Sequence, residues 1–74
     1  MHRVGSVVRI AQGLVILRAE SDEPKIGTVV LDDSLDEVGR VVDVFGPVAR
    51  PYLAVTPDDD VHVPALVGST LYAR

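Results

Sequence analysis

The sequence has no cysteine and no tryptophan, and only one phenylalanine and one lysine among its 74 residues. Without cysteine, neither a disulfide framework nor a thiolate metal site is possible, so stability must come from the apolar core or from a partner. No unbroken apolar run exceeds that at 14–17, whereas a membrane-spanning helix needs roughly 20 residues. No start typical of a secretory signal is visible. These absences predict a soluble, intracellular protein with no membrane partner.

Positive charge is scarce as well. Lysine and arginine number 7 against 11 aspartates and glutamates, which gives a formal net charge of −4. A protein that holds RNA through its phosphates needs a basic face, because counterion release supplies much of that affinity. Dispersed cations with no cluster of three make this chain a poor candidate for the main grip on RNA. The acidic balance better suits a basic protein partner or simple solubility.

Branched aliphatic side chains are abundant by contrast. Hydrophobic residues make up 47% of the chain, and fifteen residues are valine. This apolar content excludes intrinsic disorder, and the valine bias favours strands over helices. A chain of this length forms one domain, here residues 1–74.

Glycine and proline divide the chain into apolar runs of strand length. The runs at 7–10 and 14–17 flank a short loop with Gly13 and predict a hairpin. Residues 32–37 are acidic, and the spacing of Ser34 and Glu37 suggests a single helical turn. Because closure removes exposed sheet edges, short strands with regular turns predict a small all-β barrel. The further strands are expected at 26–31, 38–45, 52–55, 61–63 and 70–72.

Three of these runs, 14–17, 29–31 and 38–45, are apolar on both faces of the strand. A strand of this kind must be covered on both sides, and no helix long enough to cover one is predicted. The outer face is therefore either an exposed apolar patch that docks on another protein or part of a tightly packed small barrel. Both interpretations stay open at this point.

Residues suited to catalysis are few. His2 and His62 lie far apart in sequence, and the acidic runs at 32–36 and 58–60 are typical of solvated loops. Neither run alternates its ligands and ends in glutamate as a calcium loop does. The sequence has no nucleophile elbow, dinucleotide fingerprint or phosphate-binding loop. We therefore expect no catalytic activity, no metal site, no cofactor and no small-molecule ligand.

The segment 38–55 carries the most information. Gly39 lies within a predicted strand, where a bulge or a close backbone approach would require it. Pro47 and Pro51 restrict the backbone and stiffen the stretch between them. A stiff turn that projects Phe45, Val48 and Tyr52 loses little entropy on binding and favours recognition. The alternative is a rigid connection whose aromatic rings pack inward.

The same segment matches a known pattern: a strand with a glycine, an acidic residue, an aromatic-Gly-Pro-Val turn and a second aromatic. These positions are Gly39, Asp43, 45–48 and Tyr52, and the segments IGTVVLD at 26–32 and LVGSTLY at 66–72 also fit. On these residues the chain resembles the Gar-type subunit of H/ACA ribonucleoproteins over nearly its whole length. The turn FGPV-x-x-PY is the most specific element, and the remainder is generic β sequence.

The resemblance implies a six-stranded barrel of the translation-factor-domain type without catalytic activity. It implies docking on the catalytic domain of a TruB-like, dyskerin-type pseudouridine synthase in a particle that modifies ribosomal RNA. Such a subunit helps substrate loading and product release, and it meets guide and substrate RNA indirectly, through the particle. The chain lacks the Gly/Arg-rich tails of eukaryotic members, which are nucleolar, so an archaeal-type cytoplasmic protein is expected.

On this interpretation the partner-binding residues lie in the turn, with Arg50 facing an acid of the synthase and Gly39 and Asp43 shaping the turn region. One alternative is a PRC-barrel type interaction module, because GRVVDV at 39–44 also resembles the strand of that family. Another is a small RNA-binding barrel, which the scarcity of basic and aromatic residues disfavours. The predicted partner-binding residues are Phe45, Gly46, Pro47, Val48, Arg50, Pro51 and Tyr52.

Overall fold

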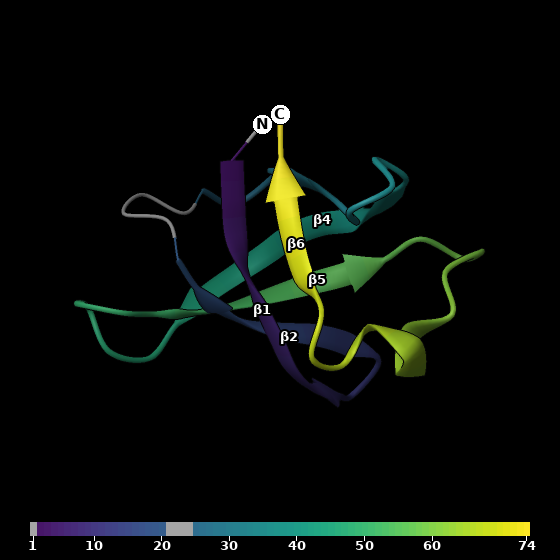
Figure 1. Cartoon of the computed structure of the whole chain (residues 1–74). Helices are drawn as coiled ribbons and strands as arrows, with labels where there is room; N and C mark the ends of the chain where they lie inside the picture. The colour runs from purple at the N-terminus through teal and green to yellow at the C-terminus, as the bar shows by residue number, and fades with distance from the viewer. Residues whose placement is uncertain (1, 21–24) are drawn as a thin grey trace.

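Six antiparallel strands close into a barrel (Figure 1). The computed structural model describes residues 2–20 and 25–74. Neighbouring strands follow the order β1-β2-β5-β4-β3-β6, and β6 pairs with β1 to complete the closure. The predicted all-β, six-stranded barrel is therefore confirmed. The elements are β1 (His2–Ala11), β2 (Leu14–Ala19), β3 (Val29–Leu31), β4 (Glu37–Phe45), β5 (Tyr52–Pro57), the 3-10 helix η1 (Val63–Leu66) and β6 (Thr70–Ala73).

Aliphatic side chains from all six strands fill the core. Leu17, Leu53 and Leu71 are the largest fully buried residues, and burial of each contributes about 1.5–3 kcal/mol. Among the described residues no polar or charged residue is buried. The described interior is thus an aliphatic core, and the polar and charged side chains described lie at least partly exposed. The core residues are Val4, Val7, Val15, Leu17, Ala19, Val30, Val38, Val41, Leu53, Val55, Leu71 and Ala73.

Among the strands predicted to be apolar on both faces, β2 and β4 differ in the exposure of the residues outside the core. Ile16 and Ala54 oppose each other across β2 and β5 and lie outside the core cluster, yet both are buried. On β4, by contrast, Val42 and Phe45 are 41% and 38% exposed. An exposed apolar patch therefore forms on β4 and not on β2.

Gly39 lies where β4 crosses closest to β5. A Cβ atom at this position would fall on the carbonyl oxygen of Thr56, so glycine is the residue that fits. Two positions farther along, the register between β4 and β5 shifts between Val41 and Asp43. Such a bulge bends the strand, and a barrel of this size needs bends of this kind to close.

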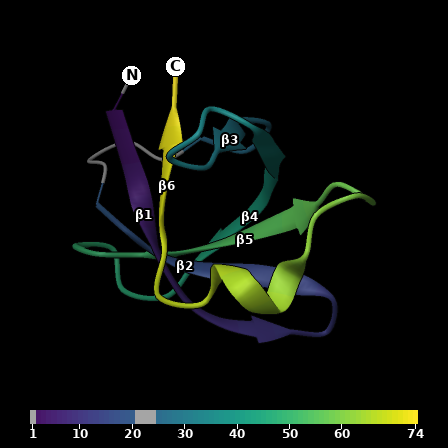
Figure 2. The same cartoon turned by 45° about the vertical axis from the view of Figure 1, so that its right-hand side comes forward.

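The strand expected at 61–63 is wrong. Val61 and His62 lie in a loop, and Val63 begins the 3-10 helix η1, which packs beside β1 (Figure 2). Pro64 stands in the first turn of η1, where its missing N–H leaves no helical hydrogen bond unmade. Val61, Val63 and Leu66 are partly buried against the core, so they fill an apolar role without pairing in the sheet.

The helical turn expected from Ser34 and Glu37 is also wrong. Asp32 Oδ1 accepts hydrogen bonds from the backbone N–H groups of Ser34 (2.9 Å) and Asp36 (3.0 Å). Leu35 adopts φ of 68°, outside the right-handed helical region. An aspartate that satisfies the backbone of a tight loop competes with helix formation, which explains the failure of the capping pattern.

The strand expected at 26–31 is shorter than predicted, because only Val29–Leu31 are in strand conformation. The backbone N–H of Gly27 still donates to the carbonyl of Val41 (2.8 Å), so the preceding turn lies alongside β4.

None of the helical structure in the described residues is long and apolar enough to cross a membrane.

Candidate interaction surface

The β4–β5 connection carries all seven residues that the sequence predicts to bind a partner. Phe45 ends β4, Tyr52 begins β5, and these two residues face each other in the register of the pair. Their neighbours Val44 and Leu53 pack on the core, so alternation along the strands directs both aromatic rings outward. The arrangement excludes the alternative in which these rings pack inside the barrel.

The two rings stack on the outer wall of the barrel, and an arginine completes a row of three side chains. The centroids of Phe45 and Tyr52 lie 5.7 Å apart with an interplanar angle of 24°. Arg18 on β2 faces Tyr52 in register; its guanidinium carbon lies 5.3 Å from the ring centroid, and Nη1 donates to the Tyr52 hydroxyl (3.1 Å). We call Arg18, Tyr52 and Phe45 the outer-face ladder.

Arg18 is not among the site residues predicted from the sequence. Alternation within β2 would have placed it on the outer face, one residue after the buried Leu17. Its partner strand could not have been found in this way, because Arg18 and Tyr52 are 34 residues apart in sequence. The pairing of β2 with β5 brings them together.

The turn between the two aromatic residues is held by its backbone. Gly46 has φ of 89°, a left-handed conformation, and a Cβ atom there would lie 3.0 Å from Cδ2 of Tyr52. The N–H of Arg50 donates to the carbonyl of Pro47 (3.2 Å), and the carbonyl of Pro51 accepts from the N–H of Ala19 on β2 (3.0 Å). The turn is therefore closed on itself and tied to the neighbouring strand.

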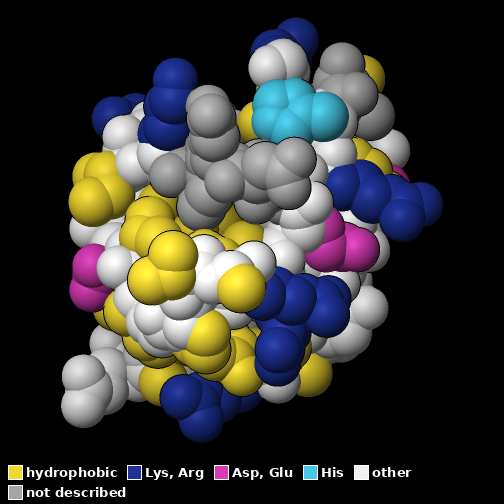
Figure 3. Space-filling model, turned by 90° about the vertical axis from the view of Figure 1, so that its left-hand side faces the viewer, with side chains coloured by type: hydrophobic (Ala, Val, Ile, Leu, Met, Phe, Trp, Pro, Cys, Tyr) yellow, Lys and Arg dark blue, Asp and Glu magenta, His cyan; other side chains and the backbone are white. Residues whose placement is uncertain are grey.

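The exposed tip of this turn is apolar with one positive charge. Val48 is 99% exposed, and Pro47 and Arg50 are also exposed, whereas Pro51 is half-buried. Figure 3 shows this side of the molecule, where hydrophobic side chains gather beside basic ones and few acidic groups are visible. We call Phe45, Pro47, Val48, Arg50 and Tyr52 the hairpin surface.

Two further exposed aliphatic residues extend the apolar area along β4. Val42 stands at the bulge, and Ile26, which is 67% exposed, precedes the turn that is hydrogen-bonded to Val41. Asp43, the other residue at the bulge, accepts a hydrogen bond from the N–H of Val44 through Oδ1 (2.8 Å). Its carboxylate thus holds the backbone just before Phe45.

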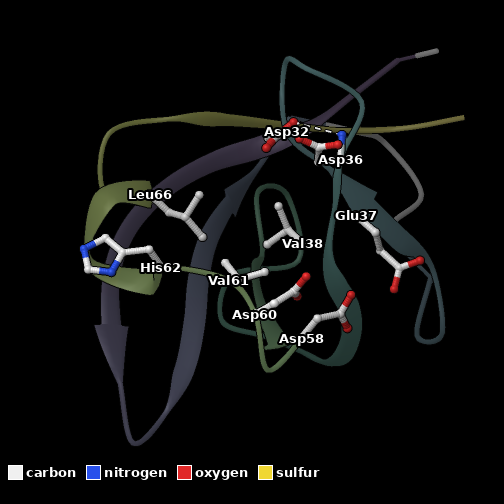
Figure 4. A pocket seen from close by; sticks show the side chains of 9 residues that line it. All are labelled: Asp32, Asp36, Glu37, Val38, Asp58, Asp60, Val61, His62 and Leu66. Carbon is white, nitrogen blue, oxygen red and sulfur yellow. Dashed lines mark hydrogen bonds between the residues drawn. The ribbon is translucent and has the colours of Figure 1, made fainter.

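The opposite end of β4 is acidic. A hollow of about 590 Å³ lies between the loops before β4 and after β5 (Figure 4). The pKa of Glu37 is raised above its ordinary value by hydrogen bonding with the Asp58 side chain and by the negative charge of that group. No group of three or more ligand-type residues in the described ranges could hold a metal ion. The hollow is lined by Asp32, Asp36, Glu37, Val38, Asp58, Asp60, Val61, His62 and Leu66.

Comparison with known proteins connects this geometry to a family. The family described as "Gar1/Naf1 RNA binding region" matches residues 1–74. The fold is similar to the solved structure of the Gar1 domain of Naf1, with a TM-score of 0.75 at 16% sequence identity, over 99% of this chain and 85% of that one. At this identity the likeness of the structures shows the fold alone.

Two archaeal proteins are related in sequence. An uncharacterised protein of Methanocaldococcus jannaschii is 43% identical over 53 residues, which cover 70% of this chain and 63% of the relative. An uncharacterised protein of Methanothermobacter thermautotrophicus is 28% identical over 76 residues, covering 97% of this chain and 82% of the relative. The matched part thus spans less than two thirds of the length of the first relative.

Proposed function

Because this chain belongs to the Gar1/Naf1 family, we propose that it is a non-catalytic protein subunit of an H/ACA guide-RNA particle. Its proposed partner is the catalytic domain of a TruB-like pseudouridine synthase. There it modulates the loading of substrate RNA and the release of product during modification of ribosomal RNA. We place this activity in the cytoplasm of an archaeal-type cell. The family match over the whole chain favours this proposal over a PRC-barrel module.

The observation that carries the docking proposal is the outward-facing aromatic stack of the hairpin surface. Aromatic and arginine side chains are enriched among residues that dominate binding energy, and Phe45, Tyr52 and Arg50 are of these types. The turn that carries them is closed by its own hydrogen bonds, so little order remains to be imposed on binding. A partner with an apolar patch and a nearby carboxylate would complement this surface.

The size of an interface indicates how far docking must extend. A specific complex buries about 800 Å² on each partner, or about one sixth of the 4588 Å² surface of this chain. The turn alone is too small to supply such an area. We therefore propose that the docked face continues along β4 to Val42 and Ile26.

Direct contact with RNA is a second candidate function. The family description names RNA binding, Arg18 lies over the ring of Tyr52, and Arg50 is exposed in the turn that precedes Tyr52. Stacking of bases on aromatic side chains beside cations is a common way to hold single-stranded RNA. The net charge of −4 argues for contact through the particle instead.

Titration separates the two candidates. The chain is titrated with an archaeal TruB-like synthase and, in a second arm, with H/ACA guide RNA alone, each at low and high salt. Submicromolar binding to the synthase with negligible binding to RNA would support the docking proposal. Binding to RNA alone that weakens steeply with salt would favour the second candidate, and binding to neither would refute both.

A further inference from the structure

The outer-face ladder assigns a role to a residue outside the hairpin surface. We infer that Arg18 is a positioning residue: it holds the ring of Tyr52 and, through that ring, fixes the orientation in which Phe45 meets the partner. The inference rests on the proposed docking function for its biological meaning. In structural terms, Arg18 on β2 fixes the orientation of Phe45 on β4 by way of Tyr52 on the intervening strand β5.

The order of the strands determines the side from which each residue of the outer-face ladder contacts Tyr52. Because β5 lies between β2 and β4, Arg18 and Phe45 approach Tyr52 from opposite sides. The same guanidinium lies against the ring and donates to its hydroxyl, which restrains both the position and the rotation of the Tyr52 side chain. Gly46 lies against a further edge of that ring. Tyr52 is therefore bounded by three neighbours, and its only aromatic contact in this group is Phe45.

The partial burial of Arg18 bears on which substitutions the barrel tolerates at this position. Arg18 is half-buried, and its Nε atom is enclosed with no hydrogen-bond partner in the part of the chain that the structure describes. Enclosing a charged donor without a partner is unfavourable, and an apolar side chain of similar shape is often tolerated equally well. A long apolar residue at this position should keep the barrel folded while releasing the Tyr52 hydroxyl.

Positioning matters because a prearranged aromatic side chain binds without losing rotational freedom at the moment of contact. Phe45 is 38% exposed, so part of its ring is free for a partner while the remainder packs on Tyr52. If Tyr52 rotates, Phe45 loses the surface against which it stacks. The feature that fits the free side of Phe45 is an apolar side chain of the synthase.

The test compares Arg18→Met with Arg18→Lys and with the matched control Arg9→Met, which alters an arginine of β1 that faces Ile16 and lies outside the ladder. Arg18→Met should weaken binding to the archaeal TruB-like synthase about tenfold while the thermal unfolding midpoint changes little. Arg18→Lys should recover only part of the affinity, because lysine lacks the planar fork. Arg9→Met should bind like the wild type.

A double-mutant cycle distinguishes positioning from direct contact. In a Phe45→Ala background, Arg18→Met should weaken binding further by less than about twofold, since the Phe45 ring whose orientation Arg18 fixes through Tyr52 is then absent. A full tenfold loss in that background would mean that Arg18 affects binding by a route other than Phe45, and this would overturn the inference. Wild-type affinity of Arg18→Met in the otherwise native chain would also overturn it.

The positioning role of Arg18 can also be measured in the free chain, without the partner. Phe45 is the single phenylalanine of the sequence, so its ring signals in NMR spectra can be assigned directly. In Arg18→Met these signals should shift and show increased ring mobility, whereas in Arg9→Met they should not change. Failure of the wild-type chain to bind the synthase would refute the docking proposal, and the Phe45 signals would still decide the positioning role. Unchanged Phe45 signals in Arg18→Met would overturn it.

Discussion

The two ends of strand β4 differ in almost every surface property. At the Phe45 end, the hairpin surface combines aromatic and aliphatic side chains with Arg50, and Arg18 lies directly beside it. At the Glu37 end, which we call the acidic end, the loops 32–37 and 58–60 carry seven of the eleven acidic residues of the chain. The charges that add up to −4 are therefore distributed unevenly over the surface. The net charge does not describe the surface that we propose to meet the synthase.

Loop side chains also have different roles at the two ends of β4. At the acidic end, Asp32 satisfies backbone N–H groups, so its carboxylate serves the local fold. At the hairpin surface, backbone groups close the turn and leave the side chains of Val48 and Arg50 free in solvent. Side chains that the fold does not use are the ones available to a partner.

The largest expected effect is on stability and comes from a change within β4, the strand that joins the two ends. Gly39→Ala should lower the free energy of unfolding by about 3 kcal/mol, because the added Cβ would fall on the Thr56 carbonyl and force β4 and β5 apart. Denaturant titration measures the change. Gly13→Ala is the control: its Cβ meets no atom within 4 Å, and the positive φ alone should cost about 1 kcal/mol. Equal losses in the two variants would contradict the close approach at Gly39.

The next effect is on binding and tests whether the two ends differ in function. Phe45→Ala should weaken binding to the synthase by about 2 kcal/mol, because a central aromatic anchor is lost. The matched control is Leu35→Ala, which removes another exposed large side chain, 49% exposed, from the acidic end. Calorimetric titration of both variants, with unfolding measured in parallel, gives the result. Equal affinity of the two variants would remove the functional distinction between the ends.

A smaller effect is expected at the tip of the turn. Val48→Asp should leave the free energy of unfolding within about 0.5 kcal/mol of wild type, because Val48 is 99% exposed. Its affinity for the synthase should fall by about 1 kcal/mol, since a carboxylate would replace apolar contact. Val67→Asp alters an exposed valine outside the hairpin surface and should bind normally. Binding of Val48→Asp at wild-type strength would exclude the tip from the interface.

The smallest effect concerns the acidic end alone and depends on pH. The pKa of Glu37 in the folded chain lies above its ordinary value of 4.5, so the folded state holds this proton more tightly than the unfolded state. The contribution of Glu37 to stability is therefore most favourable below pH 4.5 and is lost as pH rises through the raised pKa. Glu37→Gln should remove this part of the decline. Thermal unfolding from pH 3 to 7 measures it, and identical profiles of the two proteins would contradict the raised pKa.

The sequence was a good guide where side chains act through their own backbone. The valine-rich runs correctly predicted strands because branched side chains suit an extended backbone. Gly46 and Pro47 correctly marked the end of β4, since their backbone preferences are local. The prediction failed at 61–63, where Val61 packs on the core from a loop and Val63 from η1, and neither lies in a strand. Periodicity over three residues cannot separate these two outcomes.

The sequence by itself determined that this protein is a small all-β domain with a stiff turn at 45–52, because composition, proline and glycine act through local preferences. The outward direction of the two aromatic rings was decided by the packing of β4 and β5. Tertiary structure alone decided which apolar faces are covered and which stay exposed. Ile16 is buried and Val42 is exposed, although both are aliphatic residues in apolar runs. It also decided that Arg18 contacts Tyr52, because the order of the strands in the sheet places β2 beside β5. Contacts across 34 residues follow from strand order, and strand order is a property of the whole chain.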